Sequence, residues 1–251
     1  MSPSYQITLL LLLGTAGLTG LVYVVTRPTP PERMKAYGGP IGVLGRWAYF
    51  VTRPLLRIAI ALGLTANAIS GVGAVLGLAA GAFAAAGEWG WAGLSLVASA
   101  WCDLIDGEIA RATRTQGKAG AFLDSNLDRL GEIALFAGIA TSLPDRSGPV
   151  WAMAALASSM MVSYARARGE GLGVECPNFG LERPHRVVLL MIAMLAAPFL
   201  PGQGSGLLVE AACAIVAIGA SATALGRMIV IHQRLRRQEH GPRGSGPPGP
   251  A

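Results

Sequence analysis

Seven long apolar stretches, separated by short polar segments, constrain this 251-residue chain more than any other feature. A helix of about 20 apolar residues is long enough to cross the hydrocarbon core of a bilayer. Only 14% of the residues are charged, whereas soluble domains contain about 25%. We therefore expect an all-α, multi-pass integral membrane protein with spans over residues 7–26, 66–86, 89–110, 122–142, 150–165, 187–200 and 207–231.

The positive charges of the chain fall in alternate loops between the predicted spans. Arginine and lysine cluster after the first, third, fifth and seventh spans, whereas the other loops contain only Arg146. Because cytoplasmic loops carry the excess of these residues, the pattern predicts an outside N-terminus and a cytoplasmic C-terminus in the cytoplasmic membrane. The excess of positive residues in the predicted cytoplasmic loops thus accounts for the net charge of +6. We therefore expect the chain to have a lipid bilayer, and no nucleic acid, as a partner.

Flanking segments extend the region of residues 64–233, which contains the last six predicted spans. Residues 1–27 are expected to be an extra transmembrane helix rather than a cleaved signal peptide, because no Lys or Arg precedes the apolar stretch. The linker 28–63 contains residues 41–62, whose mixture of apolar side chains and arginines predicts an amphipathic helix on the cytoplasmic face; an ordinary juxtamembrane linker is the alternative. Residues 234–251 end in a Gly/Pro-rich sequence and are predicted to be a disordered cytoplasmic tail.

Four of the five aspartates lie between positions 103 and 128. Asp103 and Asp106 are three residues apart, and Asp124 and Asp128 are four apart, so the members of each pair share a helix face. If the two helices are antiparallel neighbours, the pairs meet near their cytoplasmic ends. A buried salt-bridge network with nearby arginines is the alternative explanation. Ionised carboxylates inside a membrane span are costly and usually functional, so we predict an active site here.

The chemistry of this cluster suits divalent cations and phosphate. Carboxylate oxygens are hard ligands that Mg²⁺ or Mn²⁺ prefers, and two such ions could orient a phosphoryl group and neutralise its charge. Gly107 and Ala110 leave the helix surface bare, so that a diphosphate can approach the backbone. Arg111 offers a fork of donors to phosphate oxygens, and Gly120 leaves room beside the second carboxylate pair.

The spacing of these residues resembles the signature of the CDP-alcohol phosphatidyltransferase family. The matching string is Asp103-x2-Asp106-Gly107-x2-Ala110-Arg111-x8-Gly120-x3-Asp124-x3-Asp128. The resemblance implies a six-helix transmembrane enzyme of phospholipid biosynthesis. Such an enzyme transfers a phosphatidyl group from a CDP-linked lipid, here expected to be CDP-diacylglycerol, to the hydroxyl of an acceptor alcohol and releases CMP. It also implies two Mg²⁺ or Mn²⁺ ions as cofactors, and a homodimer, since members of the family often dimerise.

The resemblance also assigns expected roles to single residues. The metal would be bound by Asp103, Asp106, Asp124 and Asp128, and Asp128 would also be the general base. The CDP moiety would be bound by Gly107, Ala110, Arg111 and Gly120. Family members often open the first core helix with Thr-Pro-Asn, and the sequence here is Thr65-Ala66-Asn67. Pro is therefore lost, but we expect Asn67 to hydrogen-bond the nucleotide.

A group of arginines after the fifth span indicates the acceptor. The branch of the family that uses inositol phosphate resembles the pattern found here, Ser163-Tyr164-x-Arg166-Ala167-Arg168-x-Glu170 followed by Glu182-Arg183-x-x-Arg186. We therefore expect the acceptor phosphate to be bound by Arg166, Arg168, Arg183 and Arg186. For any single arginine, ordinary positive-inside bias is the alternative. Glycerol 3-phosphate carries the same group, which leaves a phosphatidylglycerophosphate synthase as the alternative function. The alternative function that is not enzymatic is a cation transporter. A transport path would need polar residues throughout the depth of the bilayer, whereas the acids here cluster at one end of the spans.

Overall fold

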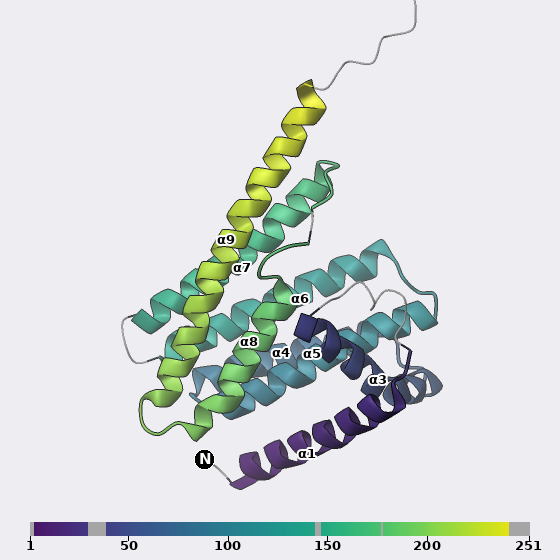
Figure 1. The fold of residues 1–251 in the computed structure, drawn as a ribbon, viewed down its shortest axis with the longest axis vertical. Helices are drawn as coiled ribbons and strands as arrows, with labels where there is room; N and C mark the ends of the chain where they lie inside the picture. The colour runs from purple at the N-terminus through teal and green to yellow at the C-terminus, as the bar shows by residue number, and fades with distance from the viewer. Residues whose placement is uncertain (1–2, 30–38, 144–146, 177, 241–251) are drawn as a thin grey trace, which may run out of the picture.

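In the computed structural model, the described residues are 3–29, 39–143, 147–176 and 178–240, and every regular element within them is a helix (Figure 1). The all-α prediction is therefore confirmed. The elements in chain order are α1 (Pro3–Thr26), α3 (Gly39–Ala61), α4 (Ala66–Ala85), α5 (Trp89–Ala112), α6 (Lys118–Ser142), α7 (Ser147–Gly171), α8 (Arg183–Ala196), the 3-10 helix η1 (Ala197–Phe199) and α9 (Gly204–His240).

Each predicted span corresponds to a helix, and the sixth is divided between α8 and η1. Among the described residues, three helices, α1, α4 and α9, are long and apolar enough by length and composition to cross a membrane. Helices α5 and α6 have 24 and 25 residues, but each carries one of the aspartate pairs and further charged residues. Helix α8 has only 14 residues.

Glycines bring α4 close to both α5 and α6. A Cβ atom added at Gly73 of α4 would lie 2.9 Å from the Cβ of Cys102 on α5. On the other side, a Cβ atom added at Gly138 of α6 would overlap the carbonyl of Gly81 on α4. Small residues allow such close helix contacts in membranes. The three helices are therefore held side by side, and the acidic halves of α5 and α6 lie next to each other.

The second half of the fold is built from α7, α8 and α9. Helices α7 and α9 run side by side, and α8 packs against both α5 and α9 (Figure 1). A continuous apolar core joins these helices to α5 and α6; its fully buried members include Phe136, Ile139, Ala152, Met194, Val209 and Val216. This core fixes the start of α8 near the acidic part of α6.

The two N-terminal helices lie against the outside of this bundle. Tyr5 of α1 is buried, and its hydroxyl donates to the Leu195 carbonyl oxygen at 2.8 Å. Helix α3 buries Thr52, whose Oγ1 accepts a hydrogen bond of 3.0 Å from Trp101 Nε1. Other positions of α3 expose apolar side chains, such as Leu55 and Ile58. One buried polar contact and an exposed apolar surface agree with the predicted amphipathic helix.

The end of α9 differs from the sequence-based expectation. Residues 234–240 were predicted to belong to a disordered tail, but α9 continues as a helix to His240. The reason is local composition, because this stretch is rich in Arg, Gln, Leu and Glu, which are good helix formers. The Gly/Pro-rich remainder, residues 241–251, lies outside the described residues, as do Arg33, Lys35, Asp145 and Arg146.

Candidate active site

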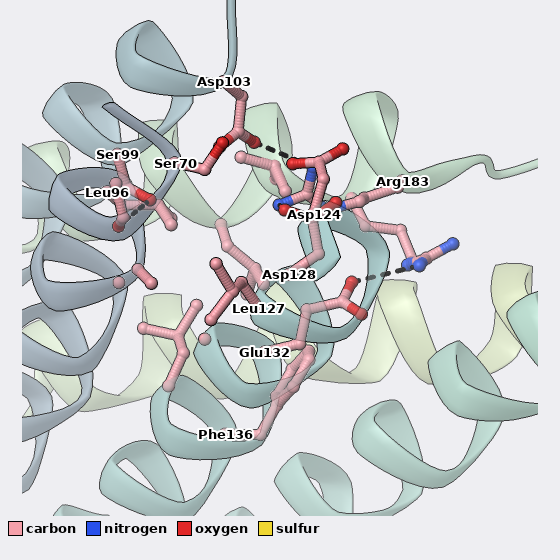
Figure 2. Close-up of a pocket in the computed structure, with 18 residues that line it drawn as sticks. Ser70, Leu96, Ser99, Asp103, Asp124, Leu127, Asp128, Glu132, Phe136 and Arg183 are labelled. Carbon is pink, nitrogen blue, oxygen red and sulfur yellow. Dashed lines mark hydrogen bonds and ion pairs between the residues drawn. The ribbon is translucent and has the colours of Figure 1, made fainter. Parts of the chain in front are cut away.

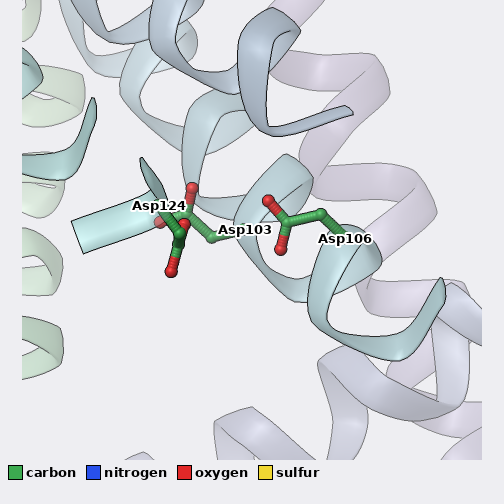
Figure 3. Close-up of side chains that lie close together, drawn as sticks. All are labelled: Asp103, Asp106 and Asp124. Atoms are coloured by element: carbon green, nitrogen blue, oxygen red, sulfur yellow. The ribbon is translucent and has the colours of Figure 1, made fainter. Parts of the chain in front are cut away.

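Four aspartates meet where α4, α5 and α6 lie together. Asp103 and Asp106 project from the C-terminal half of α5, and Asp124 and Asp128 from the N-terminal half of α6. One carboxylate oxygen each of Asp103, Asp106 and Asp124 lies within 4.8 Å of the others (Figure 3). Three of the four predicted aspartates therefore form one close cluster, and Asp128 lines a small cavity together with Asp103 and Asp124. Three carboxylates this close provide the hard oxygen donors that a divalent cation prefers.

Ser70 of α4 contacts this cluster through a hydrogen bond to Asp106. Its hydroxyl lies 2.6 Å from Oδ2 of Asp106 and can donate to it, and the Asp106 side chain is buried. The sequence analysis did not single out Ser70. The available signal was its position on α4 one turn after Asn67, which places both side chains on a similar face. The hydrogen bond holds the Asp106 carboxylate in a fixed orientation.

Arg183, at the first position of α8, links α5 and α6. Its Nη1 lies 2.9 Å from Oδ2 of Asp103, and its Nη2 lies 2.6 Å from Oδ1 of Asp128. Figure 2 shows this guanidinium directed at the aspartates of the two helices. Asp128 is therefore paired with an arginine. The sequence placed Arg183 in a loop cluster, and the structure brings it into direct contact with two of the four aspartates.

A cleft of about 590 Å³ opens beside the acidic cluster, between the start of α4, the end of α5 and the start of α6. All the residues expected to bind CDP line it: Asn67, Gly107, Ala110, Arg111 and Gly120. Asp106 and Asp124 also line the cleft. The Arg111 guanidinium is held 2.8 Å from Oε1 of Glu108 and covers Gly107, where an added Cβ atom would come within 3.0 Å of it. The cleft therefore combines bare backbone with one arginine.

A much smaller cavity, of about 40 Å³, lies on the opposite side of the aspartates. It is lined by Asp103 and Asp128 together with Arg183 and Arg186. Asp124 and Ser70 line both this cavity and the large cleft. The acidic cluster therefore borders two cavities. The large cleft contains Arg111, and the small cavity contains Arg183 and Arg186 of α8.

The four arginines expected to bind the acceptor phosphate do not share one environment. Arg186 is only 1% exposed; it contacts Glu132 Oε1 at 3.1 Å and donates to the Leu181 carbonyl oxygen at 3.0 Å. Arg166 pairs with Glu170 near the surface, at 2.9 Å. Arg168 is exposed, and neither it nor Arg166 lines the two cavities described above. Among the four, Arg183 alone contacts the aspartates.

Three ion pairs in the interior of the bundle were not predicted from the sequence. Glu132 of α6 contacts Arg186 and also lies 2.8 Å from Arg129. Arg227 of α9 lies 2.9 Å from Glu182, the residue before α8. The signal was present, because Glu132 and Arg227 fall inside the predicted apolar spans, where an ionisable residue is costly and usually has a partner.

A helical membrane fold with clustered carboxylates beside an arginine-lined cleft is typical of enzymes that transfer phosphate-bearing groups. This chain belongs to the CDP-alcohol phosphatidyltransferase family, whose sequence profile matches residues 63–233. The predicted family and the prediction of an enzyme are both confirmed. The match also supports an integral membrane protein, and together with the aspartate cluster it supports the binding of a divalent metal.

Two relatives illustrate the similarity. The chain is 34% identical over 189 residues to the archaetidylinositol phosphate synthase of Methanothermobacter thermautotrophicus, covering 73% of this chain and 94% of the relative. It is 31% identical over 192 residues to the phosphatidylinositol phosphate synthase of Streptomyces avermitilis, covering 73% and 78%. The similarity therefore covers most of both proteins.

The fold resembles a solved structure. The phosphatidylinositol phosphate synthase of Mycobacterium tuberculosis, in its crystal structure with CDP-DAG bound, matches with a TM-score of 0.65 and 23% identity over 72% of this chain and 93% of that one. A second crystal structure of that protein, in complex with manganese and citrate, matches with the same TM-score. At 23% sequence identity, this structural similarity is evidence for the fold alone.

Proposed function

We propose that this enzyme transfers the phosphatidyl group of CDP-diacylglycerol to a hydroxyl of inositol phosphate and releases CMP. The observation that carries the proposal is the position of the aspartate cluster, which borders both a nucleotide-sized cleft and a small cavity that Arg183 and Arg186 help to line. The names of the relatives in Streptomyces and Methanothermobacter support inositol phosphate as the acceptor.

The donor set of the cluster fits divalent metal. We assign Asp103, Asp106 and Asp124 as ligands because their oxygens lie within 4.8 Å of one another, and Asp128 as a further ligand one turn along α6. Carboxylate oxygen suits Mg²⁺ and Mn²⁺ equally, and we propose two ions. When bound, they would neutralise the negative charge of the diphosphate and of the departing CMP.

The large cleft is the proposed site for the CDP moiety. Gly107 and Ala110 present a helix surface without long side chains, which lets a diphosphate approach the end of α5. Arg111 donates to phosphate oxygens, for which a planar guanidinium is well suited. Asn67 and Gly120 lie next to each other in the lining of the cleft, since a Cβ atom at Gly120 would lie 3.8 Å from the Asn67 Oδ1 atom. The Asn67 side chain can therefore hydrogen-bond the nucleotide.

Asp128 is the proposed general base, and Arg183 is the proposed binding residue for the acceptor phosphate. The two side chains lie 2.6 Å apart, which supports the proposal that an acceptor whose phosphate binds Arg183 has its hydroxyl near the Asp128 carboxylate. As the hydroxyl oxygen bonds to the phosphorus that carries diacylglycerol, Asp128 takes the proton, and the bond from that phosphorus to the CMP oxygen breaks. Arg186 supports this side of the site through its contact with Glu132. Arg166 and Arg168 would guide the phosphate from the surface.

The proposed topology follows the distribution of arginine. The loops next to the acidic halves of α5 and α6 carry the positive charges, which supports a cytoplasmic active site and an outside N-terminus. The expected homodimer also remains a proposal, and its test is the mass of the purified protein in detergent. The division 1–27, 28–63, 64–233 and 234–251 is the proposed domain organisation, modified by the helical residues at 234–240.

The test is CMP release by the purified protein in detergent with CDP-diacylglycerol and Mg²⁺ or Mn²⁺. Separate reactions receive inositol phosphate, glycerol 3-phosphate, serine or no acceptor. We expect the fastest release with inositol phosphate. Faster release with glycerol 3-phosphate would instead identify a phosphatidylglycerophosphate synthase, and no release with any acceptor would refute the proposed reaction.

The base assignment has its own test. Asp128→Asn should lower CMP release at least about 100-fold, because a positioned base contributes that much, while binding of CDP-diacylglycerol stays measurable. Ser125→Ala is the matched control, since Ser125 is an exposed residue on the same part of α6. Near-normal turnover of Asp128→Asn would exclude Asp128 as the base.

A further inference from the structure

Helix α3 carries positive charge that its own residues do not balance. It contains three arginines, Arg46, Arg53 and Arg57, and neither aspartate nor glutamate. Intervals of seven and four residues put these arginines on one side of a helix with 3.6 residues per turn, and we call them the arginine face. Thr52 and Ala59, which are buried, lie on another side of α3. The side chains of Arg53 and Arg57 are exposed, so the arginine face points away from the bundle.

Protein carboxylates do not neutralise the exposed part of this face. Among the described residues, no aspartate or glutamate forms an ion pair with Arg53 or Arg57. In contrast, the arginines that line the two cavities of the active site each contact a carboxylate. The Arg53 guanidinium lies instead over the Tyr49 ring, 5.7 Å from its centroid. A ring contact leaves the positive charge available to an external anion.

A small hollow joins the arginine face to the end of α1. Its volume is about 10 Å³, which admits one oxygen-sized group. The residues around it include Arg46, Tyr49 and Arg53 of α3 together with Tyr23 and Thr29 from the end of α1 and the segment after it. The Tyr23 ring also packs against the Phe50 ring, with centroids 5.7 Å apart. Two guanidinium groups beside one such space suit an oxygen of a phosphate group whose remainder stays outside.

The surroundings of the arginine face are those of a lipid headgroup region. Apolar side chains are also exposed on α3, among them Val43, Leu55 and Ile58, and a helix with apolar and basic sides lies between hydrocarbon and water. Tryptophan and tyrosine are enriched at that depth, and α3 contains both. Thr52 is bonded to Trp101, and Ile60 lines the CDP cleft, so α3 lies at the end of the bundle that carries the aspartates. The anions present at this depth of a bilayer are the phosphates of its lipids.

We propose that the arginine face of α3, together with the end of α1, binds the phosphate groups of anionic phospholipids in the leaflet next to the active site. Guanidinium groups form strong charge-assisted hydrogen bonds to phosphate, and basic surfaces at this depth attract anionic lipids. The exposed apolar side chains of α3 would contact the acyl chains, so free phosphate should not replace the lipid. Both helices precede residues 63–233, which match the family profile, and the inference therefore goes beyond the proposed reaction.

The test measures lipid binding to the full-length protein in detergent by native mass spectrometry. Phosphatidylglycerol or phosphatidylcholine is added without CDP-diacylglycerol, acceptor or metal. We expect the wild type to prefer phosphatidylglycerol at least about 30-fold, because each basic residue near an anionic lipid contributes about fivefold. For the same reason, Arg53→Gln combined with Arg57→Gln should weaken phosphatidylglycerol binding about 25-fold and leave phosphatidylcholine binding unchanged.

The matched control removes the same number of charges elsewhere. Arg236→Gln combined with Arg237→Gln, on the exposed end of α9, should bind phosphatidylglycerol within about twofold of the wild type. Arg53→Lys combined with Arg57→Lys keeps both charges and should retain most of the preference. A ligand that binds the folded protein stabilises it. Phosphatidylglycerol should therefore raise the Tm of the wild type more than that of the double glutamine variant of α3.

Three results would overturn the proposal. Equal binding of the two lipids by the wild type would show that no anionic lipid is selected. Equal losses in the α3 and α9 glutamine variants would show that positive charge anywhere at this end is sufficient. Displacement of phosphatidylglycerol by the same concentration of inorganic phosphate would identify a soluble anion as the ligand. If the double variant does not fold, Arg57→Gln alone must weaken phosphatidylglycerol binding about fivefold. Because no substrate is present, a failure here leaves the proposed reaction untouched, and a failure of that reaction leaves this result valid.

Discussion

Replacing Glu132 with glutamine removes the charged partner of two arginines in the interior of the bundle. The Glu132 side chain is 7% exposed, and its two oxygens lie 3.1 Å from Arg186 Nη2 and 2.8 Å from Arg129 Nη1. Arg186 is too deeply buried to be rehydrated without repacking of α6 and α8. Removing one partner of a buried ion pair costs about 3–5 kcal/mol. At roughly 2–4 °C per kcal/mol for a chain of this size, the Tm should fall by about 6–20 °C.

The matched control is Glu170→Gln. Glu170 also pairs with an arginine, Arg166, at 2.9 Å, but the two side chains are 52% and 44% exposed. Such surface pairs contribute about 0–1 kcal/mol, so the Tm should change by less than about 4 °C. Tryptophan fluorescence during thermal unfolding in detergent measures both variants. Equal Tm changes would refute the reasoning, because burial would then make no difference to the strength of the pair.

Three further results are expected. Ser70→Ala should weaken Mn²⁺ binding about 10–100-fold, because it removes the hydrogen bond that orients Asp106; Mn²⁺ affinity within twofold of the wild type would contradict this role. Gly138→Ala should lower the Tm by overpacking against Gly81, at a cost of about 1–3 kcal/mol, whereas Gly14→Ala, which meets no neighbour within 4 Å, should not; a thermal scan of both variants decides this. A Mn²⁺ titration followed by electron paramagnetic resonance should show about one bound ion per chain without nucleotide and about two with CDP. The reason is that the oxygen atoms of the diphosphate would supply the ligands that the second ion needs. The same number of bound ions in both conditions would be evidence against this second site.

Helical spacing was sufficient to predict the acidic half of the site. Intervals of three and four residues put each aspartate pair on one helix face. A short connector joins α5 to α6, and α4 packs against both helices. Gly107 and Ala110, which were expected to leave the surface of α5 bare for a diphosphate, line the cleft. These inferences need only local geometry, which explains why they agree with the structure.

The basic half of the site depends on contacts that no local pattern contains. Arg183 and Arg186 are three residues apart in what reads as a cytoplasmic loop, yet one meets the aspartates and the other is buried with Glu132. The difference arises because α8 begins at Arg183 and packs between α5 and α9. A count of loop arginines predicts topology but cannot distinguish these environments. A search for ionisable residues within apolar spans would have found Glu132 and Arg227.

The charges around the aspartates explain why a metal site can exist among so many arginines. Among the described residues, five carboxylates surround the site with three guanidinium groups: Asp103, Asp106, Asp124, Asp128 and Glu132 against Arg129, Arg183 and Arg186. If all are ionised, two negative charges remain, which one divalent cation balances. The diphosphate of a CDP-linked lipid adds two more negative charges and so balances a second cation. The arginines of α8 and α6 thus lower the repulsion among the acids in the absence of substrate, and we predict that a second ion binds together with the nucleotide.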